Sequence, residues 1–181
     1  MFRTNPIGQN WGEQAKTTQV APIADSKANR QYELFIRLPE DYSENTEKSY
    51  PVLYTTDALW HFEMLSGATE YLMSDAILVG ISWQKDLDDE REFVSRFRDY
   101  TVTPFNNPEH QAQYQGGQAS NHLTFIRSDV IPHIENNYRA ASGERAYFGY
   151  SLGGVFGAYI LLAQPDTFKD YVIGSPAFSE S

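Results

Sequence analysis

The pentapeptide Gly149-Tyr150-Ser151-Leu152-Gly153 is the segment whose residue types and spacing point most directly to chemistry. It fits the pattern G-x-S-x-G, which places a serine on a sharp turn between a strand and a helix. The two glycines leave room for a strained backbone, and a hydroxyl held there can attack an acyl carbon. The Leu152 amide, at the start of the helix, can donate to the developing oxyanion. The motif therefore predicts a nucleophile elbow with Ser151 as the nucleophile.

A serine nucleophile needs a base, and this sequence does not supply one in the usual place. Proteins with this motif carry their triad in the order Ser, then Asp or Glu, then His. The residues after Ser151 hold acids at Asp166, Asp170 and Glu180, but no His. The proton of Ser151 must therefore go elsewhere, or the hydroxyl stays unactivated.

All four histidines lie upstream of the motif, at His61, His110, His122 and His133. His61 follows a turn at the end of a predicted strand and is a candidate surrogate base beside Ser151. His110 lies in a long predicted loop and is a second candidate, provided that the loop folds over the site. We expect His122 to cap a helix or face solvent, and His133 to pack as an ordinary helix residue.

Alternating strand and helix patterns surround the motif. Alternation of apolar and polar residues, or short apolar runs, predicts strands at 19–25, 31–39, 52–56, 76–81, 145–148 and 171–174, the first two as an antiparallel hairpin. Apolar residues at three- and four-residue steps predict helices at 59–73, 120–138 and 152–164, the second bent or restarted at Pro132. Residues 83–117 show no periodicity and predict a long loop. The order indicates one α/β domain over residues 1–181, with a mostly parallel sheet covered on both faces.

Further segments accompany the pentapeptide in a fixed order: residues 51–59, 96–101 (RFRDYT), 130–139 (VIPHIENNYR), 147–154 (YFGYSLGG), 164–168 (QPDTF) and 174–176 (GSP). Together they resemble the esterase family of α/β-hydrolases, which includes enterochelin esterases, S-formylglutathione hydrolases and mycolyltransferases. The similarity spans most of residues 30–178. It implies an α/β-hydrolase fold and cleavage of small-molecule carboxylic esters through an acyl-enzyme on Ser151.

The resemblance also implies a second oxyanion donor in the turn Asp57-Ala58-Leu59, where the Leu59 amide is the expected group. The family usually has Gly at the position of Ala58. We expect the Asp57 carboxylate to cap this turn rather than act in catalysis. We expect Arg98 and Asp99 to form a structural ion pair or loop anchor.

Members of this family are longer, and by resemblance the later strands, the triad acid and the triad His would lie in the part that this sequence lacks. We therefore expect an incomplete α/β-hydrolase domain with impaired activity. The strand at 171–174 would then be an apolar edge, open to self-association.

The composition of the chain indicates which kinds of partner it does not bind. With 14 Lys plus Arg against 24 Asp plus Glu, the net charge is −10, which argues against nucleic acid. No apolar run is long enough to span a membrane, and residues 1–14 lack the apolar core of a secretory signal, so we expect a cytoplasmic protein. The chain has no Cys, its histidines are scattered, and Gly116-Gly117 lacks the context of a phosphate loop. We expect neither a metal nor a cofactor.

Two alternatives share these residues. An acyltransferase would use the same site with an alcohol in place of water as the acceptor. A non-catalytic binding module would keep the fold, bind a ligand or partner saturably and form no covalent adduct at Ser151.

Overall fold

The computed structural model describes residues 18–177 of the chain. Residues 1–14, on which the expectation about a secretory signal rests, and Glu180 lie outside the described residues. Within the described part, no helix is both long and apolar enough to cross a membrane.

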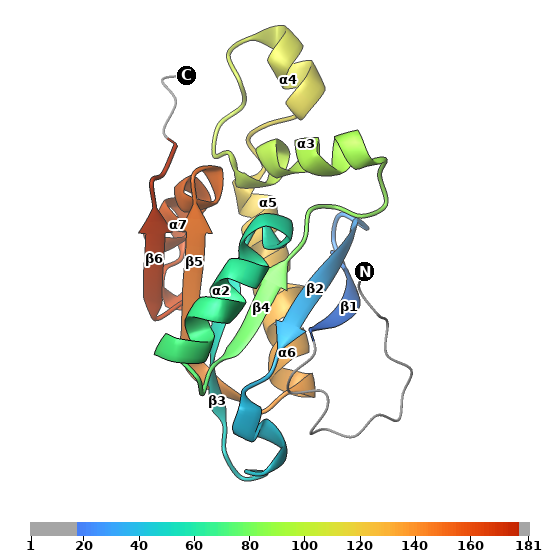
Figure 1. Ribbon diagram of the computed structural model, residues 1–181. Coiled ribbons are helices and arrows are strands. Elements are labelled where there is room, and N and C mark those ends of the chain that lie inside the picture. The colour runs from blue at the N-terminus through green and yellow to red at the C-terminus, as the bar shows by residue number, and fades with distance from the viewer. Residues whose placement is uncertain (1–17, 178–181) are drawn as a thin grey trace.

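A six-stranded sheet forms the centre of the molecule (Figure 1). Its strands, in spatial order, are β1 (Gln19–Ala24), β2 (Gln31–Arg37), β4 (Ile77–Ile81), β3 (Tyr50–Thr55), β5 (Ala140–Tyr150) and β6 (Asp170–Gly174). β1 pairs antiparallel with β2, and β2 antiparallel with β4, whereas β4, β3, β5 and β6 run parallel. The predicted hairpin and the mostly parallel sheet are confirmed. β5 runs from Ala140 to Tyr150 and is longer than the predicted strand 145–148 at both ends.

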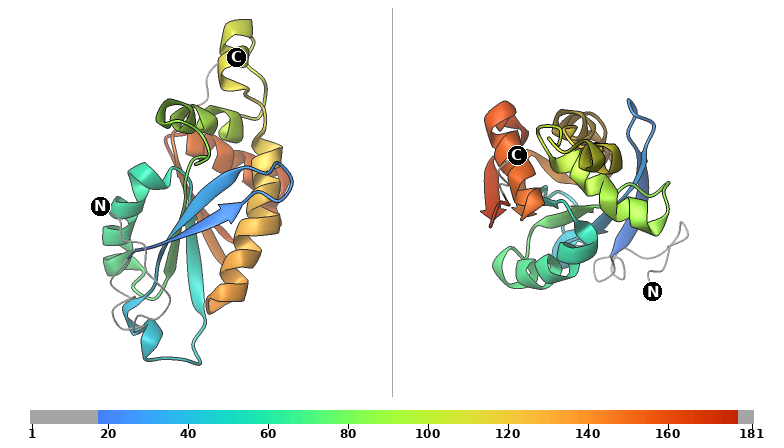
Figure 2. Two further views of the ribbon diagram at one scale, coloured as in Figure 1. Left: turned by 90° about the vertical axis from the view of Figure 1, so that its right-hand side faces the viewer. Right: turned by 90° about the horizontal axis from the view of Figure 1, so that it is seen from above.

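Helices cover both faces of the sheet, as Figure 2 shows from the side. One face carries α2 (Ala58–Leu72), and the other carries α5 (Ala119–Phe125), the π-helical turn η2 (Ile126–Val130), α6 (Ile131–Asn137) and α7 (Leu152–Ala163). Short 3-10 turns lie at η1 (Glu40–Ser43) and η3 (Pro165–Thr167). Each face has its own apolar core, one around Phe62 of α2 and the other around Ile126 and Phe156. The predicted helix 120–138 does restart near Pro132, which lies in the first turn of α6.

The prediction of a long loop at 83–117 is wrong. This segment contains α3 (Asp89–Tyr100) and α4 (Pro108–Tyr114), which stand above the carboxyl ends of the parallel strands (Figure 1). The buried positions of α3 include Glu92, Ser95, Arg96 and Asp99, so the buried side of this helix is mostly polar and its sequence lacks the usual apolar core-facing pattern. Its polar face is buried against partners from distant parts of the chain.

Candidate active site

Ser151 lies between the end of β5 and the start of α7 with φ 54° and ψ −117°. A positive φ is costly for a residue with a side chain and persists only where the surroundings enforce it. Here the Ser151 N–H donates to the carbonyl of Gly174 in β6 at 3.0 Å, and its carbonyl accepts from Ala177 at 3.1 Å. The turn is thus held on both sides by the neighbouring strand and the residues that follow it.

The two glycines of the pentapeptide are required by close packing. A Cβ on Gly149 would lie 2.2 Å from the carbonyl oxygen of Gly153, and one on Gly153 would lie 2.7 Å from Oγ1 of Thr56. No side chain fits at the first position without moving the backbone. The sequence-based reason for glycine at these positions agrees with this packing.

A buried tyrosine joins the turn at Ser151 to the turn that follows β3. The Tyr147 hydroxyl donates to the Gly153 carbonyl at 2.9 Å and lies 3.0 Å from Oγ1 of Thr56. Burial raises the pKa of Tyr147, so the hydroxyl keeps its proton and can donate. Because β3 and β5 are parallel neighbours, α2 and α7 begin side by side. Their first N–H groups, those of Leu59 and Leu152 included, have no acceptor within their own helices.

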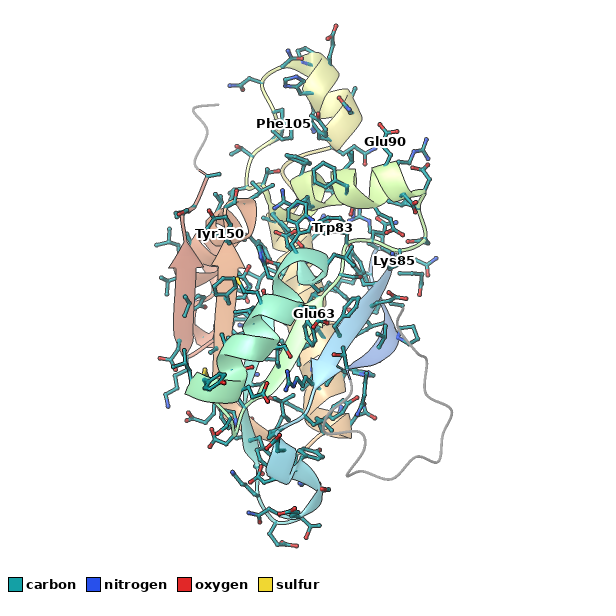
Figure 3. All side chains as sticks on the ribbon, viewed as in Figure 1. Glu63, Trp83, Lys85, Glu90, Phe105 and Tyr150 are labelled. Atoms are coloured by element: carbon teal, nitrogen blue, oxygen red, sulfur yellow. The ribbon has the colours of Figure 1, made fainter. Side chains whose placement is uncertain are left out.

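The Asp57 carboxylate does not cap the turn, so that prediction is wrong. Asp57 has a left-handed backbone, with φ 53°, and its fully buried side chain makes no capping bond to α2. Instead it accepts bonds from Arg96 Nε at 2.9 Å, Arg96 Nη2 at 2.8 Å and Trp83 Nε1 at 2.6 Å. Figure 3 shows Trp83 at the top of β4, below α3. This carboxylate therefore ties the first turn of α2 to α3.

The sequence did not predict that Arg96 is buried and bound to Asp57. Its side chain is 7% exposed, and its guanidinium lies 4.8 Å from the centre of the Trp60 ring. Burial alone would lower its pKa, but the hydrogen bonds to Asp57 and the charge of that carboxylate raise it above its ordinary value. The sequence did contain a local signal for the helix that carries this arginine. The capping residue Asp88 precedes the charged segment in which Arg96 lies beside Phe97.

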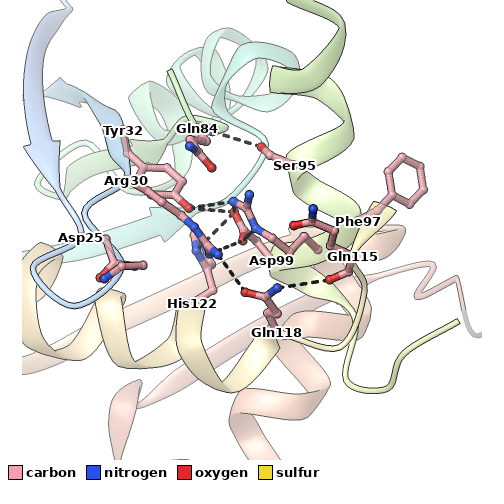
Figure 4. A network of polar contacts seen from close by, with 12 residues as sticks. Asp25, Arg30, Tyr32, Gln84, Ser95, Phe97, Asp99, Gln115, Gln118 and His122 are labelled. Carbon is pink, nitrogen blue, oxygen red and sulfur yellow. Dashed lines mark hydrogen bonds and ion pairs between the residues drawn. The ribbon is translucent and has the colours of Figure 1, made fainter. Parts of the chain in front are cut away.

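Arg98 and Asp99 do form an ion pair, with Nε of Arg98 at 2.7 Å from Oδ1 of Asp99. As Figure 4 shows, the Tyr32 hydroxyl also donates to Asp99, at 2.9 Å, which links β2 to α3. His122 of α5 lies beside this network, with Nδ1 3.8 Å from Asp99 Oδ2, and is fully buried. The expectation that it caps a helix or faces solvent is wrong, because α5 turns it into the core between α3 and α7.

The structure places the two candidate bases differently. The half-buried His61 ring packs 5.9 Å from the ring of Tyr150, the residue before Ser151. Burial lowers the pKa of His61, while the nearby Asp57 opposes the shift. Within residues 18–177, no hydrogen bond joins His61 to Ser151. His110 is exposed on α4 and lines the same cavity as Leu152.

Among the cavities in the described part of the chain, two lie at opposite ends of the sheet. The larger, of about 730 Å³, extends from Leu152 and Ala177 along α7 to residues 101–107. Figure 3 shows Phe105 of that segment above the sheet and Tyr150 at the end of β5. The other, of about 310 Å³, lies by the last turn of α2 and the start of β4, among mixed charges such as Arg37 and Asp75. Of these two, the larger lies at the end where Ser151 is held. No cluster of His, Asp and Glu suited to a metal ion occurs among the described residues.

This strand order, with helices on both faces and a serine held at positive φ after β5, is the α/β-hydrolase fold. Among solved structures, an IroE-like serine hydrolase from Shewanella oneidensis superposes with a TM-score of 0.74 at 26% identity, over 86% of this chain and 49% of that one. The BES protein from Bacillus cereus superposes with a TM-score of 0.75 at 24% identity, over 97% of this chain and 66% of that one.

The profile of the family described as "Putative esterase" matches residues 26–181, and the chain belongs to that family. The ferri-bacillibactin esterase BesA of Bacillus subtilis is 30% identical over 173 residues, which is 88% of this chain. The chain spans 58% of the length of that relative.

Proposed function

We propose that this chain carries the nucleophile and the oxyanion donors of a serine hydrolase for carboxylic esters. The observation that supports this most is the backbone of Ser151, held at φ 54° between β5 and α7. A strained serine at the positive end of a helix is suited to nucleophilic attack. The family to which the chain belongs gives the reaction type.

In the proposed reaction, Oγ of Ser151 attacks the ester carbonyl carbon and loses its proton to a base. The N–H groups of Leu152 and Leu59 donate to the oxygen that becomes negative. The tetrahedral intermediate then expels the alcohol, which takes up the proton, and leaves an acyl group on Ser151. Water attacks this acyl-enzyme and releases the acid.

The base is the weakest part of the site in this chain. No His follows Ser151 in the sequence. His61, packed against Tyr150, and His110, on the wall of the large cavity, are the surrogate bases that we propose. Because neither is hydrogen-bonded to Ser151, we propose that acylation in this chain is slow.

The proposed substrate class is a small-molecule ester. BesA is named a ferri-bacillibactin esterase, and a matched protein of Emericella nidulans, 36% identical over 76 residues, a siderophore enterobactin esterase. We propose that ester-linked siderophores are the first substrates to test.

The edge of β6 is the proposed surface for self-association. This strand lies at one end of the described sheet, and Val172 on it is 54% exposed. An open edge offers backbone hydrogen bonds to a second copy of the strand.

Intact-mass analysis after treatment with a fluorophosphonate tests the proposal. We expect a single adduct on the wild-type chain and none on Ser151→Ala. His61→Ala and His110→Ala identify the base, since the variant that lacks it is labelled more slowly. A folded wild-type chain that forms no adduct contradicts the proposed function and favours the non-catalytic module.

A further inference from the structure

The large cavity begins beside Ser151 and continues along α7. Its helical wall is a single apolar stripe, in which Leu152, Val155, Tyr159 and Leu162 are spaced three, four and three residues apart. Leu152 follows Ser151 directly, and Ala177, which also lines the cavity, donates its N–H to the Ser151 carbonyl at 3.1 Å. The cavity therefore borders the candidate active site through these two residues.

The opposite wall, residues 101–107, is held in place by α4 and by the chain that follows it. Oγ1 of Thr101 accepts from the Gly117 N–H at 2.7 Å, and the Phe105 N–H donates to Gln111 Oε1 at 2.8 Å. Gly117, at φ 92°, packs so closely on Pro104 that a Cβ would lie 2.8 Å from the proline nitrogen. This wall is built by specific contacts, so the cavity is preformed.

None of the described residues that line the cavity is Asp, Glu, Lys or Arg, although the chain as a whole has a net charge of −10. Its polar groups are hydroxyls and amides, such as those of Thr103 and Asn106, together with the imidazole of His110. A charged group buried here would find no carboxylate, ammonium or guanidinium as a counter-ion among these residues, and an anion would also meet the field of an acidic protein. The volume of about 730 Å³ lies within the range of small-molecule sites, and Leu162 is 84% exposed and open to a ligand.

We infer that this cavity binds an uncharged apolar arm of the ester whose carbonyl reacts at Ser151. The inference rests on the proposed function for the reacting group, but the binding itself does not depend on catalysis. It makes the cavity favour an uncharged arm of the ester over an anionic arm of the same shape.

Two fluorescent probes with one aromatic framework test the charge argument on the full chain. N-phenyl-1-naphthylamine is neutral, and 1-anilinonaphthalene-8-sulfonate carries an added sulfonate. We expect the neutral probe to bind saturably with one site per chain and the sulfonate to bind at least about tenfold more weakly. Equal binding of both probes, or no binding of the neutral one, overturns the inference.

A matched pair of variants on α7 locates the binding. Ala158 lines the cavity, whereas Leu161 does not line it and is 43% exposed on the same helix. We expect Ala158→Trp to fill the cavity and abolish binding of the neutral probe, and Leu161→Trp to leave it unchanged. Circular dichroism and thermal unfolding check that both variants fold. Binding that survives in folded Ala158→Trp places the probe elsewhere and overturns the inference.

Two further measurements separate this inference from its alternatives. Sedimentation of the probe-free chain tests for a second copy in the cavity: a dimer that Ala158→Trp dissociates overturns the inference. Fluorophosphonate labelling of the same samples reports on Ser151 alone. Probe binding that slows labelling supports the inference, and probe binding without any labelling refutes the proposed function but leaves the cavity as a neutral-ligand site. Probe binding with labelling at an unchanged rate overturns the link between the cavity and Ser151.

Discussion

Removal of the Arg96 side chain should leave Asp57 as an uncompensated buried charge. The Asp57 side chain is 0% exposed and that of Arg96 is 7% exposed, so water cannot replace the lost partner. Of the three side-chain hydrogen bonds that the carboxylate accepts, two come from Arg96. Breaking one side of such a buried pair costs about 3–5 kcal/mol. We expect Arg96→Met to lower the free energy of unfolding by that amount.

Urea unfolding at neutral pH measures this loss, and the same helix offers a control. Arg91 pairs with Asp88 at 3.4 Å, but both side chains are well exposed, at 73% and 64%. Arg91→Met should cost about 0.5 kcal/mol or less, because exposed pairs contribute little. Equal losses in the two variants would refute the assignment of Asp57 as a buried charge that depends on Arg96.

The double variant Asp57→Asn with Arg96→Met tests the cause of the loss. An asparagine there can still accept from Trp83 but carries no charge. Replacing both charges removes the desolvation penalty together with the attraction, so the double variant should recover most of the stability that Arg96→Met loses. If the double variant is as unstable as Arg96→Met, lost packing of Arg96 on its aromatic neighbours is the cause instead.

Three further perturbations have defined outcomes. Burial lowers the pKa of His122 below 6.5, so the unfolded chain binds the proton more readily than the folded one. The free energy of unfolding should therefore decrease as the pH is lowered from about 7.5 to about 5.5, and it should decrease less steeply in His122→Phe. Gly149→Ala should cost about 1–3 kcal/mol and abolish fluorophosphonate labelling, whereas Gly67→Ala, with open space around its Cβ, should not destabilise the chain. Val172→Lys should suppress self-association in sedimentation experiments, whereas Val102→Lys, 45% exposed and outside the sheet, should not. The first argument is contradicted if His122→Phe shows the same pH slope as the wild-type chain. The second is contradicted if Gly149→Ala is labelled, and the third if Val172→Lys still self-associates.

The elements that the sequence predicted correctly are those with a periodic apolar pattern. The run at β4 is buried at every residue. In β2 the alternate residues Tyr32, Leu34 and Ile36 belong to one apolar core, and Phe35 belongs to the other. The prediction for residues 83–117 was wrong because this segment is held by contacts between residues far apart in the sequence. The helix α3 buries Arg96 and Asp99, whose partners Asp57 and Tyr32 lie far away in sequence, and no local pattern encodes such pairs. Its capping residue Asp88, like Asn107 before Pro108, was a local signal for a helix start.

In the candidate site, too, features set by local sequence could be predicted and features set by long-range packing could not. The pentapeptide around Ser151 could be located from sequence because the chemistry of a strand-to-helix turn is local: residues 149 and 153 must be small for the turn to close. The placement of His122 could not, because a histidine at the start of a helix is exposed or buried according to what packs over it. Here α3 and α7 pack over it.

In the turn after β3, a local backbone conformation depends on contacts from residues far away in the sequence. Asp57 takes a left-handed backbone without being glycine, which costs free energy. Three hydrogen bonds to its carboxylate offset that cost, and they come from Trp83 and Arg96, which also pack against Trp60 in the next turn. The path of the Leu59 amide is therefore set by a buried ion pair and not by a flexible residue at position 58. The oxyanion donor that we propose at Leu59 is preorganised by these contacts, and preorganisation is what an oxyanion site requires.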